Sequence, residues 1–279
     1  MPTLQVLDQL TGLGFPEALR WRAGQLWFSD MFRGEVICWQ PGTPSKVVLS
    51  ADKGGPTMPG GLGWTPLGDL LVVDCLERRV LKLDSEGTIS TYADLTERSS
   101  YPLNDMHVDE DGTAWIGGYG FDPEVEQPKK SPIYRVSSQG VLTNSDPKFT
   151  FPNGFDRRHS ELVVAETFGD RVTFFDDQFQ TRKTFACHSG AGPDGLAFDG
   201  DGNLFVAMAF RSTIEKLDSH GIFQVIHQIQ TPAGSLGGEI GVFDCAIRLE
   251  DGILAYSSAC LDEAYSKSNN TGSITLVQL

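Results

Sequence analysis

A short unit recurs along this chain, and its spacing limits the folds that the sequence can adopt. Each copy begins with a proline, continues through an apolar strand-like segment and a turn rich in Gly and Asp, and ends in a second apolar segment. The five clearest copies begin at Pro16, Pro59, Pro102, Pro152 and Pro193, so successive copies lie 43, 43, 50 and 41 residues apart. A weaker sixth copy starts at Phe243.

Six such units account for nearly all of the 279 residues. A period of about 40 to 50 residues is typical of a β-propeller, in which each blade is a four-stranded sheet. The 31 glycines and 15 prolines suit a fold with many tight turns. We therefore predict an all-β protein, a six-bladed β-propeller that forms a single domain over residues 1–279.

The two ends of the chain are expected to meet in the last blade. Residues 6–10 resemble a strand that precedes the first unit, and residues 273–279 resemble a strand that ends the sixth. Propellers commonly close by letting a terminal strand complete the final blade, because this removes an exposed sheet edge. We predict that the N- and C-terminal strands close the last blade together.

Two segments interrupt the regular spacing. Residues 121–132 lengthen the third unit, and residues 231–241 form a Gly-rich stretch before the sixth. Insertions of this kind lie on a face of the propeller rather than in its sheets. Both segments are candidates for shaping the mouth of a pocket, and both are equally compatible with plain surface loops.

Charge and cysteine content exclude several classes of partner. The chain has 37 acidic and 22 basic residues, a net charge of -15, which disfavours nucleic acid and anionic membranes as partners. Its five cysteines are widely spread without a CxxC pair, so we expect reduced thiols in the core. Neither a signal peptide nor an apolar stretch of membrane-spanning length is recognisable, and we expect a cytoplasmic protein.

The positions next to the prolines are the candidate functional positions. The first strand of each propeller blade lines the central channel, so residues far apart in the sequence converge there. These positions hold Glu17, Gly61, Asn104, Asn153 and Asp194. Carboxylate and amide oxygens suit Ca²⁺, Mg²⁺ or Mn²⁺, with Zn²⁺ or Fe²⁺ less favoured. The alternative is that Asn and Asp before Gly serve only as turn residues.

Several segments together resemble one known family. Residues 15–21 (FPEALRW), 102–105 (PLND), 151–154 (FPNG), 164–169 (VAETFG) and 192–195 (GPDG) are similar to signature segments of the senescence marker protein (regucalcin), gluconolactonase and luciferin-regenerating enzyme family. The resemblance extends over nearly the whole chain in unbroken order. It implies a six-bladed propeller that carries one divalent cation and, in most characterised members, hydrolyses lactones.

The resemblance also assigns expected roles to residues. It implies that Glu17, Asn153 and Asp194 bind the metal and that Asn104 contacts the substrate and a metal-bound water. Asp122 corresponds to an acidic substrate contact of some members. Members that hydrolyse sugar lactones often carry an arginine where this chain has Pro102, so we expect a less hydroxylated, more hydrophobic lactone than gluconolactone. A second departure is Arg248-Leu249, where the family often has a Gly-Gly pair.

The function predicted from these residues is metal-dependent opening of a lactone ring. The cation would polarise the ring carbonyl while Asp194 draws a proton from the attacking water. The five histidines show no metal-ligand spacing, and the absence of a GxSxG motif gives covalent catalysis no visible nucleophile. Glu166 is expected to be a solvated residue at a strand end.

Three other functions are compatible with the same sequence. The site could hydrolyse another carboxylic ester or a phosphotriester. The protein could instead be a non-catalytic calcium-binding propeller, or a propeller that presents one face to a protein partner. The predicted partner is a small-molecule lactone or ester, and no organic cofactor is required.

Overall fold

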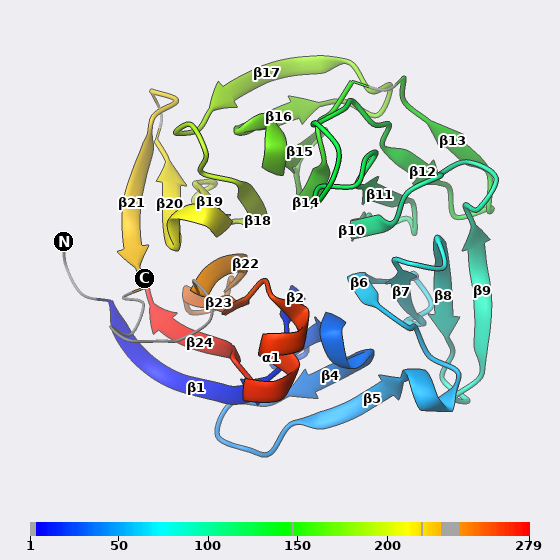
Figure 1. Ribbon diagram of the computed structural model, residues 1–279, viewed down its shortest axis with the longest axis horizontal. Coiled ribbons are helices and arrows are strands. Elements are labelled where there is room, and N and C mark those ends of the chain that lie inside the picture. The colour runs from blue at the N-terminus through cyan, green and yellow to red at the C-terminus, as the bar shows by residue number, and fades with distance from the viewer. Residues whose placement is uncertain (1–3, 147, 219, 230–239) are drawn as a thin grey trace.

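The computed structural model of the protein describes residues 4–146, 148–218, 220–229 and 240–279. Six four-stranded antiparallel sheets are arranged as blades around a central axis (Figure 1). The prediction of an all-β, six-bladed propeller is therefore confirmed. Consecutive inner strands lie side by side around the axis, and the sixth lies against the first, which completes the ring.

Each blade extends from an inner strand at the axis to an outer strand on the rim. The inner strands are β2 (Pro16–Arg22), β6 (Pro59–Trp64), β10 (Leu103–Val108), β14 (Pro152–Arg158), β18 (Pro193–Phe198) and β22 (Ile240–Arg248). The second strands are β3 (Gln25–Asp30), β7 (Leu70–Asp74), β11 (Ala114–Gly118), β15 (Glu161–Glu166), β19 (Leu204–Met208) and β23 (Ile253–Cys260).

The outer halves of the blades follow the same order. The third strands are β4 (Glu35–Trp39), β8 (Arg79–Leu83), β12 (Tyr134–Val136), β16 (Arg171–Phe175), β20 (Thr213–Leu217) and β24 (Gly272–Gln278). The outer strands are β5 (Lys46–Ser50), β9 (Ile89–Asp94), β13 (Leu142–Asn144), β17 (Thr181–Ala186), β21 (Phe223–Gln228) and β1 (Gln5–Leu13).

The described residues contain few helices. They form four short 3₁₀ turns, η1 (Met31–Arg33), η2 (Ala51–Lys53), η3 (Thr167–Gly169) and η4 (Ala209–Arg211), and one helix, α1 (Glu263–Asn269). None of the helices in the described part of the chain has the length and apolar character needed to cross a membrane.

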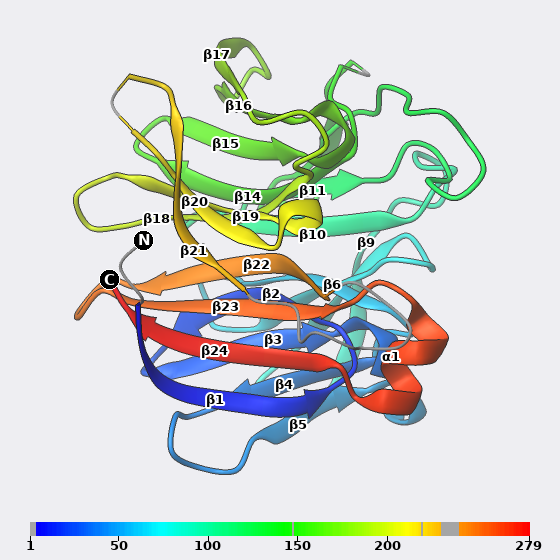
Figure 2. The same cartoon turned by 60° about the vertical axis from the view of Figure 1, so that its left-hand side comes forward.

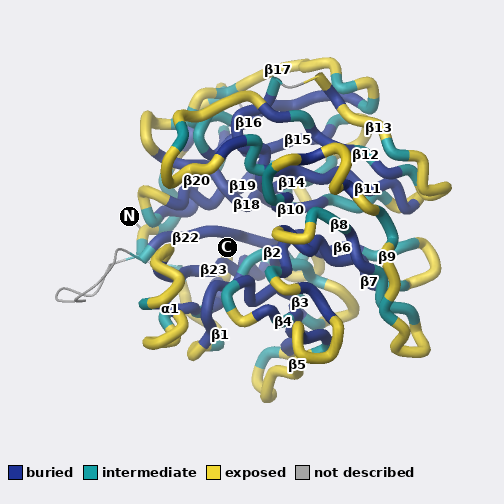
Figure 3. The backbone as a smooth tube through the Cα atoms, turned by 45° about the vertical axis from the view of Figure 1, so that its right-hand side comes forward, coloured by how far each residue is buried: buried dark blue, intermediate teal, exposed yellow. Residues whose placement is uncertain are grey.

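The recurring sequence unit corresponds to the first two strands of a blade. Proline is the first residue of β2, β6, β14 and β18, a position where its missing N–H costs little. The second strands, such as β7 and β19, are buried along their whole length because neighbouring blades cover both of their faces. Burial accordingly decreases from the inner strands to the rim (Figure 3).

The N-terminal strand forms the rim of the sixth blade. Strand β1 pairs antiparallel with β24 from Gln5 opposite Gln278 to Leu13 opposite Gly272. The two strands lie side by side at the edge of the sheet that also holds β22 and β23 (Figure 2). Since β2 of the first blade follows β1 directly, this pairing ties the first blade to the last.

Deleting residues 1–10 should lower stability by several kcal/mol, because it removes most of β1 and exposes the edge of β24. For a chain of this size we expect the melting temperature to fall by roughly 10 °C. Thermal unfolding followed by circular dichroism measures the shift, and deletion of residues 1–3 alone serves as the control. An unchanged melting temperature after the longer deletion would contradict the role of β1 in closure.

Buried acids at the ends of second strands hold the segments that lead into the inner strands. Asp30 accepts hydrogen bonds from the backbone of residues 14 and 15 at 2.8 and 2.9 Å. Glu166 accepts from the Thr150 amide at 2.7 Å and pairs with Arg171 at 2.7 Å. Asp74 binds Thr57 in the same way. The expectation that Glu166 is solvated was wrong, because Glu166 is completely buried.

The prediction for the cysteines agrees with the structure. All five cysteines are free and four of them are buried, which confirms reduced core thiols.

Residues 121–132 connect β11 to β12, and Phe121 at their start is buried while most of the segment is exposed. The second predicted insertion, residues 231–241, lies mostly outside the described residues.

Candidate functional site

A β-bulge interrupts every inner strand at the candidate positions. In β14, Asn153 and Gly154 together face a single residue of β15, and in β18, Asp194 and Gly195 face a single residue of β19. A bulge turns a side chain away from its regular direction, here at the start of a strand that lines the axis. The bulged pairs of the other inner strands are Ala18-Leu19, Gly60-Gly61, Asn104-Asp105 and Phe243-Asp244.

The sequence analysis treated the residues next to the prolines as equivalent positions of the blades, and the observed strand register differs at two of them. Glu17 lies one residue before its bulge, where it pairs with Ser29. In the second blade Gly60, rather than Gly61, is level with Asn104. Glu17 nevertheless lies close enough to Asp194 for the two charges to affect each other.

The glycines that follow Asn153 and Asp194 allow the inner strands to approach closely. A Cβ atom on Gly154 would lie 2.5 Å from the carbonyl oxygen of Asp194 in the next blade. A Cβ atom on Gly195 would lie 1.7 Å from Oδ1 of Asp244. The Gly residues of the repeated motif are therefore required by packing around the axis, which places the Asp244 carboxylate against Gly195, the residue after Asp194.

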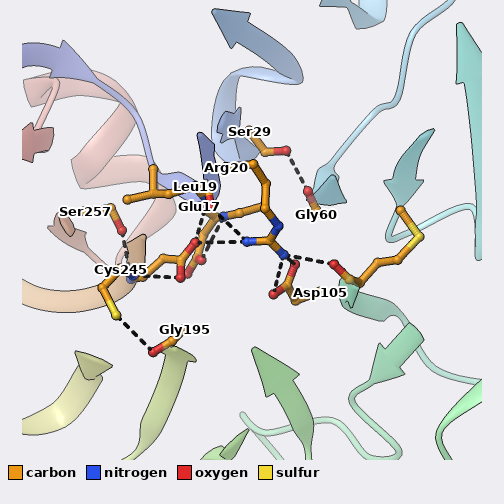
Figure 4. A network of polar contacts seen from close by, with 12 residues as sticks. Glu17, Leu19, Arg20, Ser29, Gly60, Asp105, Gly195, Cys245 and Ser257 are labelled. Atoms are coloured by element: carbon orange, nitrogen blue, oxygen red, sulfur yellow. Dashed lines mark hydrogen bonds and ion pairs between the residues drawn. The ribbon is translucent and has the colours of Figure 1, made fainter. Parts of the chain in front are cut away.

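An ion-pair network fills the axis beside these residues (Figure 4). The Arg20 guanidinium donates to both carboxylate oxygens of Asp105, at 2.8 and 3.0 Å, and to the Met106 carbonyl at 2.9 Å. It also lies 3.8 Å from the carboxylate of Asp244. Asp244 accepts from the Leu19 amide at 2.5 Å, so the network joins β2, β10 and β22. Arg20 therefore compensates the charges of Asp105 and Asp244.

The other two acids have no comparable cation. Burial and the charges of Asp194, Asp244 and Asp105 raise the pKa of Glu17 well above its usual range. Burial, with Asp244 and Asp105, raises the pKa of Asp194, and the Asn153 amide opposes that rise. Burial raises the pKa of Asp244 to about 7, although Arg20 acts in the opposite direction. Four carboxyl groups thus share one guanidinium, and the raised pKa of three of them means that without a further cation they favour binding protons over carrying negative charge.

These residues fit a divalent cation. Asp194 is 5% exposed, and no described group donates a hydrogen bond to its Oδ1 atom. An unpartnered carboxylate oxygen in a buried site is costly unless a cation binds it. The described residues contain no cluster of three or more His, Cys, Asp and Glu side chains arranged for a metal. The candidate set instead combines the carboxylates of Glu17 and Asp194 with the amide of Asn153, and its oxygen donors suit a hard cation.

Asn104 and Asp122 differ in their surroundings. Asn104 is 8% exposed and lies in β10, next to the strand that carries Asn153. Asp122 is exposed, and its carboxylate accepts a hydrogen bond from the Glu124 amide at 3.0 Å within the inserted loop. The structure thus places Asn104 with the other candidates at the axis, whereas Asp122 lies on the loop.

Sequence reasoning missed four residues of this region. Arg20, Asp105, Asp244 and Tyr119 were not identified as parts of the site. Burial and the charges of Cys75, Asp194 and Glu17 raise the pKa of Tyr119. Three of them had a sequence signal: Arg20 and Asp105 lie inside the segments 15–21 and 102–105 that resemble the family, and the weak sixth unit places Asp244 level with Gly195.

Two cavities of the structure lie away from these residues. A cavity of about 560 Å³ opens at the other end of the channel, where Arg20, Trp64 and Phe155 contribute to its walls. A larger one, of about 850 Å³, lies between the fourth and fifth blades at Arg158, Phe174 and Leu217. Neither is lined by Glu17, Asn153 or Asp194, so the candidate site rests on the convergence of charges rather than on cavity size.

Comparison with protein families places this arrangement in a known group. Residues 15–236 match the SMP-30/Gluconolactonase/LRE-like region, a match that begins just before Glu17 and includes Asn104, Asn153 and Asp194. The chain belongs to this family. A curated relative is diisopropyl-fluorophosphatase from Loligo vulgaris, 27% identical over 212 residues that cover 67% of each protein.

Solved structures of low sequence identity share the fold. A luciferin-regenerating enzyme superposes with a TM-score of 0.75 and 18% identity, covering 97% of this chain and 93% of the other. The calcium-binding protein regucalcin from Agrobacterium tumefaciens gives 0.74 and 17%, and a gluconolactonase from Xanthomonas campestris gives 0.71 and 20%. These two comparisons each cover 99% of this chain and 95% of the other.

Proposed function

We propose that this protein is a divalent-metal-dependent hydrolase that opens the ring of a lactone. The proposal rests on one observation: Glu17 and Asp194 lie on inner strands at the channel axis, close enough for the charge of Asp194 to raise the pKa of Glu17, and neither has a cationic partner among the described residues. Membership of a family that includes gluconolactonases supports a hydrolytic function. The fold shared with a solved gluconolactonase is consistent with it.

Glu17, Asn153 and Asp194 would hold the cation. Their oxygen donors favour Ca²⁺, and Mg²⁺, Mn²⁺, Zn²⁺ and Fe²⁺ are the alternatives. The calcium-binding protein among the similar structures supports the first choice. When bound, the cation would polarise the carbonyl group of the substrate.

The chain itself would orient the substrate and move a proton. The Asp194 carboxylate would accept a proton from the water that attacks the lactone carbonyl carbon. The ring C–O bond would then break, the departing alkoxide would take the proton that Asp194 had accepted, and the product would be a hydroxy acid. Asn104 would contact the substrate from the neighbouring blade, and Asp122 would contact a more distant part of it from the loop.

A second candidate function is hydrolysis of a phosphotriester or another ester. The observation that favours it is the similarity to diisopropyl-fluorophosphatase, which has the highest identity among the relatives described above. A non-catalytic calcium-binding role is the remaining alternative, and the similarity to regucalcin favours it.

Removing the metal should abolish hydrolysis, and restoring a divalent ion should recover it. The experiment measures bound metal by elemental analysis, and then turnover of lactones, aryl esters and diisopropyl fluorophosphate before chelation, after chelation and after addition of each ion. A binding-only protein would show metal-dependent stabilisation without turnover of any substrate. Full activity in metal-free protein would refute the proposed mechanism.

A further inference from the structure

A continuous row of aromatic rings runs beside the candidate site. The ring centroids of Tyr119 and Phe151 are 4.4 Å apart, those of Phe151 and Phe168 are 5.0 Å apart, and those of Phe168 and Phe210 are 5.8 Å apart. These distances are typical of favourable aromatic pairs. We call these four residues the aromatic row, and it spans the third, fourth and fifth blades.

The backbone places the row next to the candidate ligands of the same blades. The Tyr119 amide donates to the Pro102 carbonyl at 3.0 Å, two residues before Asn104. Phe168 follows Thr167, whose hydroxyl accepts a hydrogen bond from the Asn153 amide at 3.2 Å. The three side chains of the candidate site that come from these blades, Asn104, Asn153 and Asp194, thus lie beside the row.

Phe210 reaches this position because the residue beneath it is a glycine. A Cβ atom on Gly192 would lie 2.4 Å from the Phe210 ring, and Gly192 precedes Asp194 by two residues. Any larger residue at this position would displace the ring. The last ring of the row is therefore held against the backbone that leads into Asp194.

Packing between the blades does not account for the whole row. Phe151 is nearly buried and is supported by Phe121 at 5.8 Å, whereas Phe210 is 45% exposed, and Tyr119 and Phe168 are partly exposed. Phe151 also has a φ of 56°, a left-handed conformation that is unusual for an aromatic residue. Such strained residues cluster at ligand sites. Partly exposed rings beside a charged site are suited to binding a planar apolar group.

We propose that the aromatic row is the specificity surface of this site and selects substrates that carry an aromatic ring next to the hydrolysed ester bond. This inference rests on the proposed hydrolytic function and names its substrate class. The row offers one hydroxyl group, that of Tyr119, and otherwise only ring carbons. A polyhydroxylated sugar lactone would leave its hydroxyl groups without partners along this surface, whereas an aryl group would bury apolar area.

A matched pair of substrates tests the proposal. Phenyl-substituted and methyl-substituted γ-butyrolactone differ only in the group that the row would bind. We expect the metal-loaded protein to favour the phenyl compound about tenfold in kcat/KM, through KM, as expected for an added aromatic contact. In Phe168→Ala and Phe210→Ala the preference should fall to within about threefold.

Phe185→Ala is the control, because it removes a ring of the fourth blade that packs on Phe174 at 5.8 Å in the outer part of the sheet. It should keep the full phenyl preference. Binding of the corresponding γ-lactams, which resist hydrolysis, should show the same tenfold difference by calorimetry. Equal binding of the two lactams, or a preference unchanged in both row variants, would overturn the proposal. Hydrolysis without phenyl preference would refute this inference alone, whereas lactam preference without hydrolysis would refute only the proposed function.

Discussion

Asp194→Ala is expected to lower hydrolytic activity by at least 10² to 10⁴, the contribution of a typical general base, or roughly 3 to 5 kcal/mol of barrier. The substitution removes a proposed ligand and the proposed base together. Added divalent metal should therefore fail to restore activity, unlike in the chelated parent protein. Steady-state rates and bound metal, measured in parent and variant, test this expectation.

The control for this variant is Asp201→Ala. Asp201 is an exposed acid in the turn at the other end of the same inner strand, so the change in formal charge is identical. Its activity and metal content should equal those of the parent. If Asp194 served only as a turn residue, Asp194→Ala would keep its metal affinity, and that result would contradict the proposed site.

The fold could be predicted because its signals are local and repeated. Each proline and each Gly- and Asp-rich turn acts within a few residues, and six copies at nearly constant spacing define blades without any long-range information. The N-terminal strand was also recognisable, although it extends over Gln5–Leu13 rather than residues 6–10.

The register within the site could not be predicted in the same way. The position of a bulge depends on hydrogen bonding to the next strand, and the repeated proline does not fix it. Glu17 therefore lies one residue before its bulge, and Gly60 rather than Gly61 is level with Asn104. Counting the same number of residues from each repeated proline identified the strands that line the channel. It did not show which side chains of those strands lie at the same level.

The ion-pair partners of Arg20 could not be predicted from the sequence, for a different reason. Arg20 contacts Asp105 and Asp244, which lie 85 and 224 residues away in the sequence. Asp105 and Asp244 share one position of the repeated unit, but nothing in the sequence pairs that position with Arg20. Only closure of the ring shows that this arginine lies on the axis and neutralises two acids.

Arg20→Met should destabilise the protein by about 3 to 5 kcal/mol, because it leaves Asp105 and Asp244 buried without their cation. Methionine keeps much of the apolar volume, so the loss reports mainly on charge. Arg22→Met is the matched control on the same strand, since Arg22 is exposed and stacks on Trp64 at 4.7 Å. Its loss should stay below about 1 kcal/mol. Urea unfolding measures both values.

A compensating variant separates loss of charge balance from loss of packing. Adding Asp105→Asn and Asp244→Asn to Arg20→Met removes both uncompensated carboxylates, so the triple variant should recover most of the lost stability. If methionine merely packs badly, the two asparagines would restore nothing. A loss below about 1 kcal/mol in Arg20→Met would show that the two acids are neutral or solvated in the folded protein. In that case the charge imbalance that favours a cation at Glu17 and Asp194 over bound protons would be smaller than the arrangement of side chains implies.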